Sequence, residues 1–143
     1  MPSPDAAQTQ AFADALRSLS GLFLRVTAER SAAHAAFSKQ DLLAIGVLAE
    51  RGPSRMGTLA DALGVGQSAV TPLVDKLEAA GAVRRRRGDD RRVWLVELTP
   101  DGDAVAQAEA EAYRAVAASM LDPLSAADRE ALIGLLARIQ PSR

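Results

Sequence analysis

The hydrophobic periodicity of this chain changes abruptly at Gly81. Before this glycine, four apolar residues recur at the three- and four-residue spacing of one helix face: Val70, Leu73, Val74 and Leu77. After it, apolar residues alternate along residues 93–98, as they do in a half-buried strand. Residues 82–87 can pair with that strand, and Gly88-Asp89-Asp90 supplies turn residues between the two. The sequence therefore predicts a helix followed directly by a β-hairpin.

The segment before this helix has the pattern of a helix-turn-helix. A short helix is predicted from Thr58, with Asp61 completing a capping box and Gly64 as its stop. One tight turn separates it from the helix of residues 67–80. A further helix is predicted before this pair. It has a second capping box at Ser38 and Asp41, and Gly52-Pro53 ends it.

Longer helices flank this central region. Residues 5–30 are predicted to form one helix with an apolar stripe at alternating spacings of four and three: Phe12, Leu16, Leu19 and Phe23. Another helix is predicted over residues 100–120, capped by Thr99, and a last one after Ser125 with apolar positions at Leu132, Leu135, Leu136 and Ile139. The stripe of the first helix fits an ordinary core face or a contact with a partner chain. We expect a mainly α fold with a small hairpin.

Composition excludes several classes of protein. The chain has no cysteine, which removes disulfides, thiolate nucleophiles and thiol switches, and its one histidine, His34, cannot form a metal cluster. No elbow, dinucleotide or phosphate-loop motif is present, so we expect no catalytic residue, no metal and no cofactor. Asp89-Asp90 is better explained as a turn than as a catalytic pair. No signal peptide or membrane span is predicted, which indicates a cytoplasmic protein.

Charge is unevenly distributed along the chain. The net formal charge is -1, yet residues 84–92 hold six arginines and two aspartates, a local charge of +4. Such a run is usually a solvated surface. Here it lies on a predicted hairpin beside a helix whose exposed face carries Gln67, Ser68, Thr71 and Lys76. Arginine forks on a two-stranded ribbon suit phosphate oxygens or a narrow minor groove, so this pattern favours DNA binding.

With these residues assembled, the chain resembles the MarR family of winged helix-turn-helix transcription regulators. The resemblance lies in LADALGVGQSAVTPLVDKLEAAGAVRR and in GDDRRVWLVELTPDG. It implies a homodimer with a winged helix-turn-helix lobe over residues 37–99 and a helical dimerisation region over 5–36 and 100–143. The dimerisation residues would be Phe12, Leu16, Leu19, Phe23, Leu132, Leu135, Leu136 and Ile139. Two departures are Gly66, where family members usually have a serine cap, and Pro72 inside the recognition helix.

The resemblance also implies roles for single residues. The predicted DNA contacts are Gln67, Ser68, Thr71, Pro72, Lys76, Arg84, Arg86, Arg91 and Arg92. Arg91 would reach the minor groove, and Arg92 would pair with Asp75 and brace the wing. Many members bind small aromatic acids or phenols in a crevice, for which Arg30, His34, Phe37 and Met56 are the candidate liners. The stretch VTPLVDKLE resembles the peroxide-sensing branch of the family, which also has a proline at this place. That branch senses through cysteine, and this chain has none, so that mechanism cannot operate here.

The main hypothesis is therefore a dimeric repressor that binds a pseudo-palindromic DNA operator and is released by a small anionic or phenolic ligand. A dimeric protein-interaction module of the same fold that has lost DNA binding is the alternative. An enzyme is the third interpretation, and it would need His34 beside a carboxylate and a metal.

Overall fold

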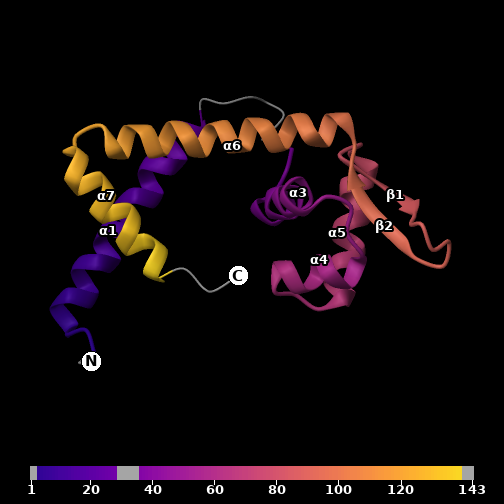
Figure 1. Cartoon of the computed structure of the whole chain (residues 1–143), viewed down its shortest axis with the longest axis horizontal. Coiled ribbons are helices and arrows are strands. Elements are labelled where there is room, and N and C mark those ends of the chain that lie inside the picture. Colours follow the sequence, from indigo (N-terminus) through magenta and orange to yellow (C-terminus); the bar gives the residue numbers. More distant parts are fainter. Residues whose placement is uncertain (1–2, 29–35, 140–143) are drawn as a thin grey trace. The chain divides into compact units, whose positions relative to one another are not determined.

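The computed structural model describes residues 3–28 and 36–139, which form helices and one hairpin (Figure 1). In chain order the elements are α1 (Ala6–Ala28), α3 (Lys39–Arg51), α4 (Met56–Leu63), α5 (Gln67–Ala79), β1 (Val83–Arg87), β2 (Trp94–Leu98), α6 (Pro100–Leu121) and α7 (Ala126–Ile139). The predicted mainly helical fold with one antiparallel hairpin is confirmed. None of the described helices is both long and apolar enough to cross a bilayer.

The described chain forms two compact units. One contains α3, α4, α5, the hairpin and the part of α6 up to Glu111, and the other contains α1, α7 and the part of α6 from Ala112. This boundary differs from the one predicted from the sequence, at residue 100. The first part of α6 belongs with the hairpin unit because Val105 and Ala106 pack against its core.

The core of the hairpin unit lies between its three short helices and β2. The predicted buried stripe of α5 is confirmed, with Val70, Leu73, Val74 and Leu77 all buried. They meet Ile45 and Leu48 of α3, Leu59 of α4 and Val96 of β2 in one cluster. Burial of this apolar surface is the main contribution to the stability of the unit.

Capping sets where the helices of this unit begin and end. Ser38 and Asp41 form the predicted capping box, because the Ser38 side chain accepts from the Asp41 N–H and the Asp41 carboxylate accepts from the Ser38 N–H. Gly64 ends α4 with a φ of 66°, a left-handed conformation that favours glycine.

The predicted cap at Thr58 is wrong. The cap position of α4 is Arg55, three residues earlier, and this cap makes no side-chain hydrogen bond. The cause is tertiary: Ser54 forms an isolated bridge with Val96 through N–H···O bonds of 2.9 and 2.8 Å, which holds the chain extended up to that point. Met56 then packs against the core, so the helix starts directly after the bridge.

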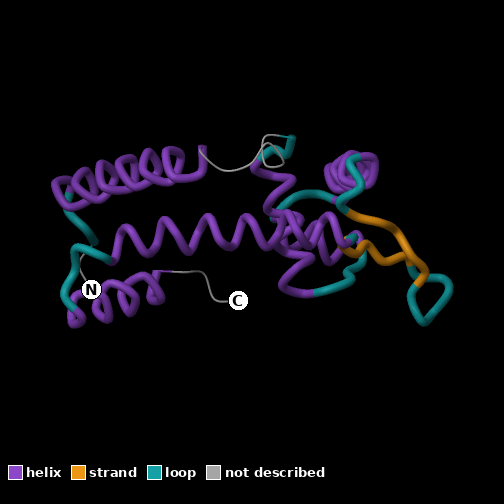
Figure 2. Tube along the Cα trace, turned by 90° about the horizontal axis from the view of Figure 1, so that it is seen from above, coloured by secondary structure: helices purple, strands orange, loops and turns teal. Residues whose placement is uncertain are grey.

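The hairpin pairs Val83 with Leu98 at its base and Arg87 with Trp94 at its outer end. The loop of residues 88–93 extends beyond the two strands (Figure 2). Beyond β2, Thr99 caps α6 by accepting from the Gly102 N–H at 3.1 Å, as predicted. Its hydroxyl also donates to the Gly81 carbonyl at 2.5 Å, and its N–H donates to Ala82 at 3.0 Å. The base of the hairpin and the start of α6 are thereby joined.

The second unit leaves much of its apolar surface exposed. The Phe23 ring packs on Tyr113 of α6 with 4.8 Å between ring centroids. Other apolar side chains of α1 and α7 are exposed in the single chain: Phe12, Leu16, Leu19, Leu132, Ile133, Leu135, Leu136 and Ile139. Exposed apolar surface on two helices is typical of an interface with another chain.

Candidate nucleic-acid interface

The outer face of α5 is polar and open to solvent. Gln67, Ser68, Thr71, Pro72 and Asp75 are all exposed along it, opposite the buried stripe. Gly66 stands at the cap position without a side-chain cap bond, so no side chain covers the first amides of the helix. Pro72 has no N–H, so the Ser68 carbonyl lacks its usual helical donor. This end of α5 therefore presents both donors and acceptors to a ligand.

Arg85 connects the hairpin to α5. Its guanidinium donates to the Asp75 carboxylate at 2.5 Å and also to Glu78. The hydrogen bond to Asp75 raises the pKa of Arg85 most, burial opposes this, and Glu78 adds to it. Asp75 and Glu78 lie one helical turn apart, so a single fork spans both. This contact fixes the hairpin against the helix.

The prediction that Arg92 pairs with Asp75 is wrong, because the partner of Asp75 is Arg85. Arg92 belongs to the loop of residues 88–93, whereas Arg85 is in the middle of β1, next to the second half of α5. The bracing role that the sequence analysis gave to Arg92 therefore belongs to Arg85.

Arg84 and Arg86 share one carboxylate on the same face of the hairpin. Glu97 accepts from Arg84 Nε at 2.7 Å and from Arg86 Nε at 2.5 Å, and its Cα is directly opposite that of Arg84. The hydrogen bonds from Arg86 and then Arg84 hold the pKa of Glu97 below its ordinary value. Glu97 therefore offsets part of the positive charge of this face.

Lys76 pairs with a carboxylate from another helix. Its ammonium contacts Asp41 of α3, whose side chain is only 1% exposed. Burial alone would raise the pKa of Asp41, but hydrogen bonds from Lys76 and Ser38 outweigh it and lower that pKa. The sequence analysis assigned Lys76 to DNA contact. In the structure its charge fixes α5 to the start of α3.

This pair predicts a pH-dependent stability. We expect Asp41→Asn to lower the free energy of unfolding by about 1–2 kcal/mol at neutral pH, because the cap and ion pair weaken. The folded-state pKa of Asp41 lies below its ordinary value of 3.8, so its contribution is complete above that value and is lost as pH falls through the folded-state pKa.

Urea unfolding of the wild type and Asp41→Asn should show a stability difference that narrows as the pH is lowered below about 4. Asp61→Asn, at an exposed carboxylate of α4, is the control and should differ little from the wild type at any pH. A constant difference for Asp41→Asn across the acid range would contradict the ion-pair explanation.

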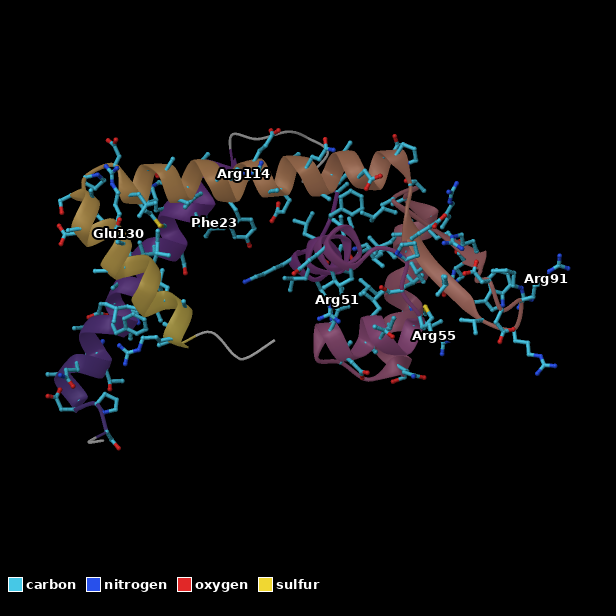
Figure 3. All side chains as sticks on the ribbon, in the orientation of Figure 1. Phe23, Arg51, Arg55, Arg91, Arg114 and Glu130 are labelled. Atoms are coloured by element: carbon cyan, nitrogen blue, oxygen red, sulfur yellow. The ribbon has the colours of Figure 1, made fainter. Side chains whose placement is uncertain are left out.

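The outer end of the hairpin carries the arginines that remain available. Arg91 and Arg92 are exposed, and neither has an ion pair with any carboxylate in the described part of the chain. Arg91 lies at the outer end of the loop and points away from the ribbon (Figure 3). Rigid, unpaired guanidinium groups at a protruding tip suit an anionic groove.

Two further cations were missed by sequence reasoning. Arg51 at the end of α3 and Arg55 before α4 are exposed and have no ion pair among residues 3–28 and 36–139. Both are single charges, so no run or periodic pattern marks them. Only their place beside α4 in the folded unit makes them candidates for phosphate contact.

Only two of the four predicted ligand liners fall within the described residues. Arg30 and His34 lie outside the described residues, while Phe37 and Met56 pack against the core of the hairpin unit. A shallow hollow of about 280 Å³ in this unit is lined by other residues: Leu48, Ala49, Gly52, Pro53, Glu97, Leu98 and Asp103. No cluster that could hold a metal occurs within the described ranges.

Comparison with known proteins identifies this arrangement of helices and hairpin. Residues 38–94, which run from the cap of α3 to the start of β2, match the profile of the MarR family. This match covers less than half of the chain, so it shows a likeness to the MarR family over the segment from α3 to β2. In MarR terms, α4 and α5 form the helix-turn-helix and the hairpin is its wing.

A curated protein is also similar to part of the chain. The chain is 44% identical over 61 residues to an uncharacterised HTH-type transcriptional regulator, YcgE, from Bacillus subtilis. That match covers 41% of this chain and 40% of the relative, so it concerns less than half of either protein.

Solved structures extend the likeness in fold to nearly the whole chain. RV1404 from Mycobacterium tuberculosis has a TM-score of 0.80 at 26% identity, covering 96% of this chain and 94% of that one. FabT from Streptococcus pneumoniae, solved in complex with DNA, has a TM-score of 0.79 at 21% identity, covering 92% and 94%. At that identity the FabT likeness concerns the fold alone.

Proposed function

We propose that this chain is a MarR-type, sequence-specific DNA-binding repressor that acts as a homodimer. The observation that carries the proposal is the exposed polar face of α5, with a wing beside it. At the tip of this wing the guanidinium groups of Arg91 and Arg92 have no ion pair within the described part of the chain. In this arrangement α5 meets base edges in the major groove, while Arg91 enters the adjacent minor groove. FabT, which has the same fold, was solved with DNA bound.

The contact set is narrower than the arginine run suggests. Arg84 and Arg86 share Glu97, Arg85 binds α5, and Lys76 binds Asp41. These residues shape the interface and hold its parts together. The proposed direct contacts are Gln67, Ser68, Thr71, Pro72, Arg91 and Arg92, with Arg51 and Arg55 added at phosphates.

Dimerisation is part of the proposal. The exposed apolar residues of α1 and α7 would be covered by the same residues of a second copy, in a twofold arrangement. Two recognition helices would then bind half-sites about 34 Å apart, on one face of a pseudo-palindromic operator. Release by a small anionic or phenolic ligand stays a prediction, because two of its predicted liners, Arg30 and His34, lie outside the described residues.

Arg91→Ala is expected to weaken binding to the protein's preferred duplex about ten-fold or more, because a groove contact contributes about 1–3 kcal/mol. The duplex would be recovered by selection from random-sequence DNA, and binding measured by fluorescence anisotropy at several salt concentrations. Arg84→Ala is the matched control: it removes the same charge from the same hairpin, but from a side chain that Glu97 already pairs. It should have the smaller effect.

The outcome also decides between the two functional hypotheses. If the wild-type protein selects no duplex even at low salt, the dimeric interaction module replaces the repressor. If the protein binds DNA but Arg91→Ala binds as well as the wild type, the wing-tip contact is wrong.

A further inference from the structure

The peptide group between Arg91 and Arg92 is held at both of its polar atoms by side chains. Its carbonyl oxygen accepts a hydrogen bond of 2.8 Å from Arg87 Nη1. Its N–H donates to Asp90 Oδ1 at 2.9 Å. The loop is further closed by Gly88 N–H to the Val93 carbonyl at 2.8 Å and Val93 N–H to the Asp90 carbonyl at 2.9 Å. An exposed six-residue loop is therefore fixed at the position from which the Arg91 side chain projects.

Arg87 is itself held in place by the only tryptophan of the chain. Its Cα lies opposite that of Trp94 in the last pair of the hairpin ladder, and its guanidinium carbon is 3.9 Å from the centroid of the indole ring. A guanidinium stacked flat on a ring keeps its N–H bonds in the plane, free to donate sideways. The Arg87 guanidinium can therefore stack on Trp94 and donate to the Arg91 carbonyl at the same time.

This use of Arg87 differs from that of its neighbours on β1. Arg84 and Arg86 are engaged by Glu97, and Arg85 is engaged by α5. Arg87 is the arginine of this strand whose side chain reaches the loop backbone. Trp94 is 48% exposed, so the stack adds little to the core and its position at the loop needs another explanation.

We propose that Arg87 and Trp94 are positioning residues for DNA recognition: stacked together, they fix the Arg91–Arg92 peptide so that Arg91 is presented to the groove in one orientation. This inference rests on the proposed function, because it concerns how Arg91 meets DNA. Presentation in a fixed orientation reduces the conformational entropy that the tip loses on binding.

The stack can be tested without DNA. Because Trp94 is the only tryptophan, its fluorescence reports this site alone. We expect Arg87→Ala to increase acrylamide quenching of Trp94, since the guanidinium no longer covers one face of the indole. Arg86→Ala removes the same charge from the neighbouring position and should leave quenching unchanged. Equal quenching in the wild type and Arg87→Ala overturns the proposal.

The positioning role is tested by a double-mutant cycle on the selected duplex. Arg87→Lys keeps the charge, but a lysine cannot stack flat and donate sideways at once. We expect it to raise the dissociation constant about five-fold, equivalent to about 1 kcal/mol. In an Arg91→Ala background, Arg87→Lys should raise the dissociation constant less than about two-fold, because the side chain that Arg87 positions is absent.

Trp94 provides the matching rescue experiment. Trp94→Phe keeps an aromatic face for the guanidinium and should bind nearly as well as the wild type, whereas Trp94→Leu should weaken binding as Arg87→Lys does. Arg114→Lys, at an exposed arginine of α6 outside the proposed interface, is the charge-conserving control and should bind as the wild type does. Melting curves of all variants should coincide, since these side chains lie outside the core.

Each of these binding results supports or contradicts the positioning role of Arg87. If Arg87→Lys binds DNA as tightly as the wild type, Arg87 does not act through Arg91. The same follows if the effects of Arg87→Lys and Arg91→Ala on the free energy of DNA binding are additive. If the wild type binds no duplex, the proposed function fails and the positioning role with it. The quenching result then shows separately whether the stack was present.

Discussion

Replacement of Gly102 by alanine is expected to lower the free energy of unfolding by about 3 kcal/mol, the largest effect that we predict for a single methyl group in this chain. A Cβ at this position would lie 1.9 Å from the carbonyl oxygen of Ala82 and 2.9 Å from its carbonyl carbon. Both distances are far inside van der Waals contact, and both atoms belong to the backbone. A flexible side chain could move aside, but this carbonyl is held in place.

Several bonds restrain the Ala82 carbonyl. It accepts the Thr99 N–H at 3.0 Å, while the N–H of Ala82 donates to Leu77 at 2.9 Å. Ala82 is itself buried, and Thr99 also bonds Gly81 and Gly102. A shift large enough to accept the methyl group would separate the start of α6 from the turn between α5 and β1. The wing would then lose its support at the base.

Chemical unfolding of Gly102→Ala and the wild type measures this effect directly. Gly46→Ala is the matched control, because Gly46 lies within α3 of the same unit and a Cβ there meets nothing within 4 Å. Alanine favours helix over glycine by up to about 1 kcal/mol, so the control should be neutral or slightly stabilised. Equal unfolding midpoints for Gly102→Ala and the wild type would contradict the close approach of α6 to Ala82.

Local signals explain which parts of the fold could be predicted. The stripe of α5, the stop at Gly64 and the cap at Ser38 depend on residues within one or two helical turns, so their spacing in the sequence is sufficient. The start of α4 depends instead on Ser54, which pairs with a strand some forty positions away. A capping pattern at Thr58 could not reveal that contact.

The ion pairs of the candidate site also depend on contacts between separate elements, which the sequence pattern does not show. The sequence shows six arginines and several acids, but the partner of each is decided by strand register and by which helix lies below. Arg85 and Arg92 are equally plausible partners for Asp75 until the hairpin is placed against α5. Lys76 looks like an exposed cation until Asp41 is brought next to it from α3. Alternation along the strand by itself indicates only that the arginines of β1 are divided between two faces.

The second large effect is expected at the proposed dimer interface. Leu19 lies on the apolar stripe of α1 and is 44% exposed in the single chain. We expect Leu19→Asp to raise the dimer dissociation constant about a hundred-fold or more. In a twofold interface each substitution occurs twice, and two unpaired carboxylates buried together cost several kcal/mol. Sedimentation velocity across a range of protein concentrations would measure the shift.

Gln10→Asp is the control for this experiment. It adds the same charge to the same helix, but nine residues away and therefore on the opposite face from Leu19, where the side chain is exposed and polar. It should leave the dimer intact. Leu19→Asp should also lose most of its operator affinity while its hairpin unit keeps its fold, because a monomer holds one half-site at a time. A Leu19→Asp protein that remained a dimer would show that α1 is not at the interface, and the exposed face of α7 would then have to carry the dimer.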